Sequence, residues 1–229
     1  MRLSKIDSIE MKTTAFSIFL LTTVICFGQT ETNEVLWTGL GTKIKFNKKI
    51  RLDLEQQVRF QNKFKNYAYT FTEFGLNYKP TKEIRLASNY RYMTYKRGIR
   101  HRYALEAHYT FKPKKSKFYF HIRDRFQVFV WQDNNSNTSN IRNLITIGYK
   151  ATKLVRIYTT QEWFYRLDNI NTLTTYRGTA GINWNISTAI TLMTYYSYQK
   201  SINSTFKKNT HIIGLRGFYK IDLSKKEKK

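Results

Sequence analysis

The chain has 229 residues, with 40 Lys and Arg against 15 Asp and Glu, a formal net charge of +25. Only one apolar run, Thr13–Phe27, approaches the roughly 18 residues that a spanning helix needs, so the composition excludes a helical membrane protein. Arg falls mostly inside strand-like segments and Lys mostly in turns and the tail, which argues against a single nucleic-acid-binding face.

Residues 1–28 have the pattern of an export signal. Met11-Lys12 gives a short positive start, and Met11 is an alternative initiator. The apolar core Thr13–Phe27 follows, and Gly28 is a small residue at the cleavage position. Cys26 lacks the preceding small residue that lipid attachment requires, so we expect it to leave with the signal. The mature chain then has no Cys for a disulfide, a zinc site or a nucleophile.

The stretch Ile50–Phe60 shows the pattern of the rest of the chain. Apolar residues occupy positions 50, 52, 54, 58 and 60, and charged or amide residues occupy the odd positions between them. Successive side chains of a strand point to opposite faces, so one face is apolar and the other polar. A soluble sheet also alternates, but about eleven residues is the length with which one tilted strand crosses a bilayer.

This pattern recurs along the chain and predicts eleven strands. They span 35–46, 50–60, 67–78, 84–95, 101–111, 118–131, 141–150, 154–166, 175–184, 189–199 and 209–221. Behind an export signal, they indicate an all-β fold: a transmembrane antiparallel up-and-down β-barrel of 10–12 strands. Its domain covers residues 29–223, and residues 224–229 form a basic polar tail. Because bacterial barrels have an even strand count, twelve strands are favoured, with ten next.

The connections between these strands alternate in expected length. Short ones are expected at 47–49, 79–83, 112–117, 151–153 and 185–188, and longer ones at 61–66, 96–100, 132–140, 167–174 and 200–208. Outer-membrane barrels have short periplasmic turns and longer external loops, so this alternation favours such a barrel over a soluble sandwich.

The apolar parity is expected to face lipid, with an aromatic girdle near the strand ends. Six aromatic residues stand just before a short turn or the C-terminal tail, where an interfacial girdle belongs. They are Phe46, Tyr78, Phe111, Tyr149, Trp184 and Tyr219. Asp124 breaks the apolar parity of its strand, and a β-bulge or a register slip there would move it off the lipid face.

The polar parity is expected to line the lumen with a charge network. Its members are Arg51, Asp53, Glu55, Arg59, Glu73, Arg85, Arg91, Arg102, Glu106, Arg123, Arg125, Arg156, Glu162, Arg177 and Arg216, and Arg142, Arg166, His108 and His121 share this parity. Arg outnumbers the acids, so pairing every acid still leaves a basic interior. The network is either purely structural or it attracts anions.

Several short motifs, in order, carry a family resemblance. They are Leu36-Trp37-Thr38-Gly39, Arg59-Phe60, Tyr90-Arg91-Tyr92, His101-Arg102-Tyr103, Arg123-Asp124-Arg125, Gln161-Glu162-Trp163-Phe164, Tyr176-Arg177-Gly178 and His211-Ile212-Ile213-Gly214. Across the mature chain they resemble the domain of unknown function 2490 family, outer-membrane barrels common in Bacteroidetes and related bacteria. The resemblance implies a fold and a location, and no activity.

No catalytic pattern accompanies the strands. GxSxG, HExxH, Walker-type and GxGxxG elements are missing from any supporting context. His101 and His211 stand near strand ends, with Ser88, Ser197 and Ser201 as available hydrolase partners, but no spacing pairs them. The sequence predicts no catalytic residues, no cofactor and no metal.

The sequence thus predicts an outer-membrane barrel that is structural, assists assembly, or forms a narrow, largely plugged, anion-preferring pore. An outer-membrane lipid-modifying enzyme is the alternative, and a soluble exported barrel that binds a small ligand is the second. Expected partners are outer-membrane lipid and, during biogenesis, the assembly machinery, with no nucleic acid. The oligomeric state is not indicated.

Overall fold

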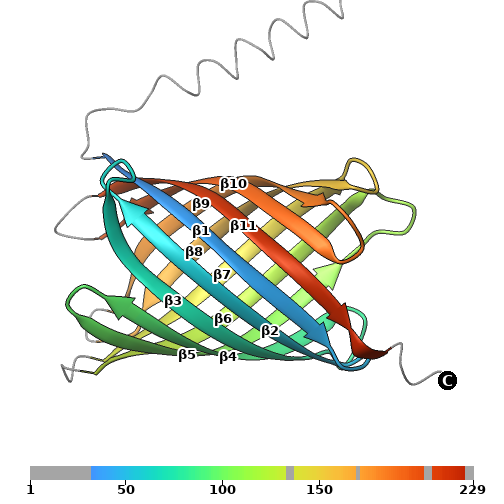
Figure 1. The fold of residues 1–229 in the computed structure, drawn as a ribbon, viewed down its shortest axis with the longest axis horizontal. Helices are drawn as coiled ribbons and strands as arrows, with labels where there is room; N and C mark the ends of the chain where they lie inside the picture. Colours follow the sequence, from blue (N-terminus) through green and yellow to red (C-terminus); the bar gives the residue numbers. More distant parts are fainter. Residues whose placement is uncertain (1–31, 133–136, 169–170, 204–207, 225–229) are drawn as a thin grey trace, which may run out of the picture. The chain divides into compact units, whose positions relative to one another are not determined.

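Eleven strands form one closed β-barrel in the computed structural model, which describes residues 32–132, 137–168, 171–203 and 208–224 (Figure 1). They are β1 (Thr32–Lys45), β2 (Ile50–Gln61), β3 (Asn66–Tyr78), β4 (Ile84–Tyr95), β5 (Gly98–Phe111), β6 (Phe118–Trp131), β7 (Thr138–Lys150), β8 (Val155–Arg166), β9 (Thr172–Asn185), β10 (Ile190–Ser201) and β11 (Asn209–Asp222). The predicted fold class is confirmed. The signal at 1–28 and nearly all of the tail at 224–229 lie outside the described residues.

The barrel closes with a parallel pair. Every other neighbouring pair is antiparallel, whereas β1 and β11 run in the same direction, from Thr32↔Asn209 to Lys45↔Asp222. An odd number of up-and-down strands leaves the first and last strands parallel, so eleven strands close without a twelfth. No twelfth strand occurs in the described residues. The barrel therefore has an N rim, where β1 begins, and a C rim, where β11 ends.

The predicted short–long alternation of the connections is wrong. The connection from β4 to β5 is only Lys96-Arg97, and those at 46–49 and 62–65 have the same length although they lie at opposite rims. Four strands begin three residues earlier at the N rim than the sequence indicates, at Thr32, Gly98, Thr138 and Thr172. Beyond the apolar belt both faces of a strand can be polar, so alternation fades while the hydrogen-bonded ladder continues.

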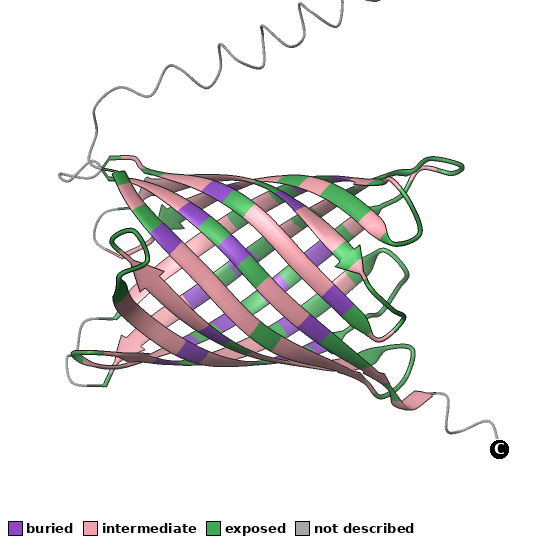
Figure 2. Cartoon of the chain, turned by 45° about the horizontal axis from the view of Figure 1, so that its top comes forward, coloured by how far each residue is buried: buried purple, intermediate pink, exposed green. Residues whose placement is uncertain are grey.

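Exposed residues alternate with less exposed ones along much of the barrel wall, most regularly on β5 (Figure 2). Large apolar side chains are exposed on the outside, as at Leu40 (73%) and Leu105 (63%), while Arg102 (1%) is buried inside. Asp124 stays on the outer face. The β5–β6 and β6–β7 ladders run through it without a bulge, and Asn143 Nδ2 donates to Asp124 Oδ1 over 2.6 Å. The expected bulge or slip is therefore wrong, and a neighbouring amide satisfies the carboxylate.

Candidate functional site

Strand register sets charged residues side by side inside the barrel. Glu73 on β3 stands beside Arg91 on β4, which stands beside Arg102 on β5. Arg91 Nε donates to Glu73 Oε2 over 2.6 Å, and Arg102 Nη2 contacts the same oxygen. One half-buried carboxylate thus holds two guanidiniums from successive strands.

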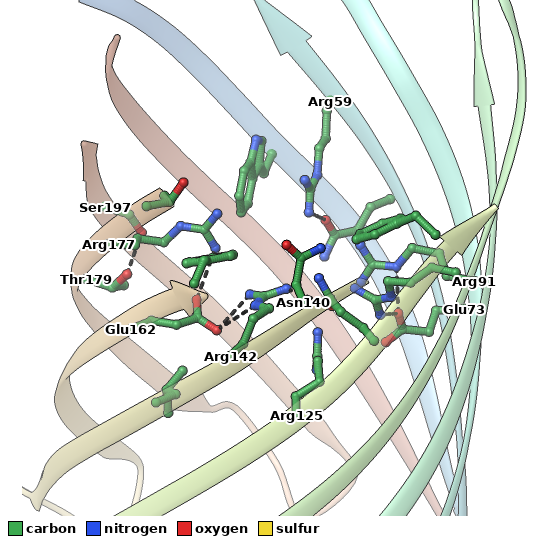
Figure 3. A pocket seen from close by; sticks show the side chains of 18 of the residues that line it. Arg59, Glu73, Arg91, Arg125, Asn140, Arg142, Glu162, Arg177, Thr179 and Ser197 are labelled. Atoms are coloured by element: carbon green, nitrogen blue, oxygen red, sulfur yellow. Dashed lines mark hydrogen bonds and ion pairs between the residues drawn. The ribbon is translucent and has the colours of Figure 1, made fainter. Parts of the chain in front are cut away.

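Glu162 on β8 forms a larger cluster (Figure 3). Arg142 Nη2 donates to its Oε1 over 2.7 Å, Arg123 Nη2 contacts the same oxygen, and Arg177 Nη1 lies 3.4 Å from Oε2. These guanidiniums come from β7, β6 and β9, so the cluster joins four strands. The Glu162 side chain is only 4% exposed, and one carboxylate serves three cations.

The remaining lumenal acids are also paired. Glu106 contacts Arg125 and lies 2.6 Å from His108 Nε2, and Glu55 lies 2.6 Å from Arg216 Nη2. Arg51 Nε donates to Asp53 over 2.7 Å. The five predicted lumenal acids are therefore all paired with basic groups.

These pairs divide the lumen into two cavities. The N-rim chamber has a volume of about 810 Å³ and the C-rim chamber about 360 Å³. Both are lined by the same layer of six residues: Glu55, Glu73, Arg123, Arg125, Met193 and Arg216. The ion pairs of this layer link the barrel wall at mid-height, which narrows any path from rim to rim.

The two chambers differ in charge. Among the described residues, ten Arg and only three Glu line the N-rim chamber. The C-rim chamber has six Lys and Arg against four acids, among them Arg51, Asp53 and Arg85. Of the predicted network, Arg156 lines neither chamber. The interior is thus basic mainly toward the N rim, so a small anion would find its favourable potential there.

A family comparison gives this barrel its place among known proteins. The chain matches the family described as "Protein of unknown function (DUF2490)" over residues 34–210, from β1 to the start of β11. The chain belongs to the DUF2490 family. No protein of established annotation matches it. A solved structure titled "NanC porin structure in rhombohedral crystal form" is similar at 12% identity and a TM-score of 0.49, over 69% of this chain and 78% of that one.

Sequence reasoning missed several chamber residues of this DUF2490 member. The sequence pattern places Arg100 in a connection, yet the residue lies on β5, lines the N-rim chamber and donates to the Thr138 hydroxyl over 2.8 Å. Trp37 on β1 also lines it. Extending the parity of Arg102 back by two positions would have found Arg100, and the parity opposite to that of the exposed Leu40 would have found Trp37.

The predicted girdle residues lie near the C rim. Phe46, Tyr78, Phe111, Trp184 and Tyr219 are each 39–52% exposed, and Tyr149 is half-buried against Phe118, with ring centroids 4.9 Å apart. Near the N rim, histidine and tyrosine residues form hydrogen-bonded clusters on the outer face. Tyr90 and His101 share a 2.9 Å hydrogen bond, as do Tyr196 and His211 at 2.6 Å.

The candidate hydrolase residues are not brought together. His211 faces outward, whereas Ser197 is buried in the lumen and hydrogen-bonded to Thr179 over 2.7 Å. Ser88 shares the outer face with His101, but His101 stands beside Tyr92, four positions further along β4, a separation of about 13 Å. In the described residues, no group of three His, Cys, Asp or Glu could hold a metal ion. No helix of the described chain is long and apolar enough to cross a membrane.

Proposed function

We propose that this protein spans the outer membrane of a Gram-negative cell as a narrow, largely plugged barrel whose basic lumen prefers anions. Export would use the signal at residues 1–28, and insertion would use the outer-membrane assembly machinery. The barrel would contact outer-membrane lipid around its whole circumference.

The outer surface supports a membrane location. Its exposed belt includes Phe74, Leu86, Leu105, Ile145 and Leu215. On β5 the outward positions run from His101 to Phe111, which at about 3.4 Å per residue and about 40° of tilt gives about 26 Å along the barrel axis. The apolar band of an outer-membrane barrel is about 25 Å tall. A soluble barrel exposing this much apolar surface would aggregate.

The observation that carries the anion preference is the lining of the N-rim chamber, ten Arg against three Glu among the described residues. Guanidinium groups remain charged at every physiological pH. Three carboxylates can offset only three of these ten charges, so the chamber wall keeps a net positive charge. A low-dielectric wall lined by one sign of charge attracts counter-ions of the other sign. Small anions are thus favoured over cations throughout this half of the lumen.

The dividing layer supports a nearly closed passage. Barrels of about eight strands are filled by side chains, and those of 16–18 strands hold an aqueous channel, so eleven strands lie between these limits. Here the ion pairs of Glu55, Glu73 and Arg125 occupy mid-height. We therefore expect only a small leak.

Planar-bilayer recording of the purified protein under a steep KCl gradient tests this proposal. The expected result is a small conductance whose reversal potential is shifted from zero toward the equilibrium potential of chloride. Bilayers that receive detergent alone should show no such conductance. A large, stable, cation-selective conductance would overturn the proposal. Recovery of the mature protein in a detergent-free soluble fraction would favour the soluble ligand-binding alternative instead.

A further inference from the structure

We propose that the N-rim chamber is a binding site for one compact polyvalent oxyanion, such as a chain of linked phosphates or a small polycarboxylate, held by Arg59 and Arg177 beside Trp37. This deepens the proposed function, since it rests on the basic lumen described there. The site lies in the larger of the two chambers, away from the six-residue dividing layer.

Two guanidiniums meet over one indole ring. Arg59 from β2 lies 3.6 Å from the ring centroid of Trp37, and Arg177 from β9 lies 5.0 Å from the same centroid. Both side chains project into the cavity from different parts of the wall (Figure 3). Like charges repel, so holding them together is unfavourable unless an anion lies between or beside them.

Arg59 has no acidic partner among the described residues. It contacts the Tyr69 hydroxyl, and its Nη2 lies 3.4 Å from Gln57 Oε1, both neutral groups. Its Nε is buried and makes no hydrogen bond within the described chain. Arg177 makes its closest hydrogen bonds to the neutral Gln199, at 2.5 and 3.0 Å, and only the long 3.4 Å contact to Glu162.

Other chamber guanidiniums also keep unused donors. Within the described residues, the Nε atoms of Arg100 and Arg102 are buried without a hydrogen-bond partner, and the Arg102 residue is 1% exposed. The planar fork of a guanidinium matches the paired oxygens of a carboxylate or phosphate. The wall thus offers several oxyanion donors at once.

Chamber size and charge narrow the ligand. A volume of about 810 Å³ falls in the range of small-molecule sites, roughly 300–1,000 Å³. The excess of Arg over Glu favours several negative charges over one. Guanidiniums cover two of the aromatic faces that could stack a flat ligand: Arg59 lies on Trp37, and Arg142 lies 4.2 Å from the ring centroid of Phe164. The chamber therefore suits a compact anion rather than a nucleobase.

Calorimetry on the full barrel in detergent tests the site, using tripolyphosphate, citrate and orthophosphate as probes. We expect one tripolyphosphate or citrate per barrel, bound at least about tenfold more tightly than orthophosphate. Whichever polyvalent probe binds more tightly identifies the phosphate or the carboxylate class. Binding should change tryptophan fluorescence, and Trp37→Phe should abolish that change.

The decisive variants are Arg59→Gln and Arg85→Gln. Each removes one lumenal cation that lacks an acidic partner in the described structure, but Arg85 lines the C-rim chamber, where it contacts Asn77 and His108. Arg59→Gln should weaken binding by about tenfold or more, as expected for a lost charge-assisted hydrogen bond, and Arg85→Gln should leave it unchanged. Heat-modifiable gel migration checks that both variants fold.

Equal weakening by the two variants, or no preference for polyvalent probes, would overturn the site. An anion-selective leak without that preference would leave the proposed function standing and refute only this inference. Arg59-dependent binding in a barrel that conducts cations would support the oxyanion site and refute the proposed anion preference.

Discussion

Glu162→Gln tests whether the lumenal ion pairs stabilise the barrel. The substitution keeps the side chain's size and one acceptor oxygen, but it removes the negative charge shared by Arg123, Arg142 and Arg177. At an effective dielectric constant of about 20, one pair about 4 Å apart contributes about 4 kcal/mol. Removing one partner of a buried pair typically costs about 3–5 kcal/mol. Water that enters the N-rim chamber would solvate part of the guanidinium charge left unpaired by the substitution. We therefore expect the free energy of unfolding to fall by about 3 kcal/mol.

The assay is guanidinium-induced unfolding of the barrel in detergent, followed by tryptophan fluorescence and by the heat-modifiable gel band. Glu83→Gln is the matched control, because Glu83 is exposed in the β3–β4 connection and its loss should change the free energy of unfolding by less than about 0.5 kcal/mol. A loss below about 1 kcal/mol for Glu162→Gln, or equal losses for the two variants, would refute a stabilising role for the cluster.

Three further predictions concern the wall and its location. Ile145→Arg puts a charge on the apolar belt and should lower the free energy of unfolding by about 2–4 kcal/mol near the midplane. Leu144→Arg points into the chamber beside Glu162 and should lower it much less. Unfolding in lipid vesicles compares the two variants. Gly214→Ala places a methyl group against the Tyr195 ring, so its unfolding midpoint should fall, and a midpoint at or above wild type would show that the ring moves freely. The protein should fractionate with outer membranes and migrate faster on gels when unheated; soluble periplasmic recovery would contradict the membrane assignment.

The strands were predictable because each carries its own alternation. All eleven predicted strands are present. Their parity is strongly specified, because a shift of one residue would move every side chain of a strand to the other face. Their N-rim ends were not predictable, because the contrast between an apolar outer face and a polar inner face, which creates the alternation, fades near the rim. Arg100 was missed for this reason, although it stands two positions before Arg102 on β5.

The partners within the lumen depended on register. Parity indicated that Glu73, Arg91 and Arg102 face inward. Only the pairing of β3, β4 and β5 brings the two guanidiniums to the Glu73 carboxylate. The division into two chambers depends on side chains from across the barrel, a relation that no single segment contains. The parallel closure likewise depends on contacts between the two ends of the chain.

Spin labels on opposite faces of the wall test the central claim, an apolar exterior in lipid around a basic, hydrated lumen, most directly. Cys26 is the only cysteine in the sequence, so Leu105→Cys and Thr160→Cys each add one further thiol for labelling. Leu105 is exposed at the middle of β5, and Thr160 lines the N-rim chamber. In reconstituted vesicles, the Leu105→Cys label should collide with oxygen dissolved in lipid, and the Thr160→Cys label should collide more with a water-soluble anionic relaxing agent. Equal access of the aqueous agent to both labels, or the reverse order, would contradict the account.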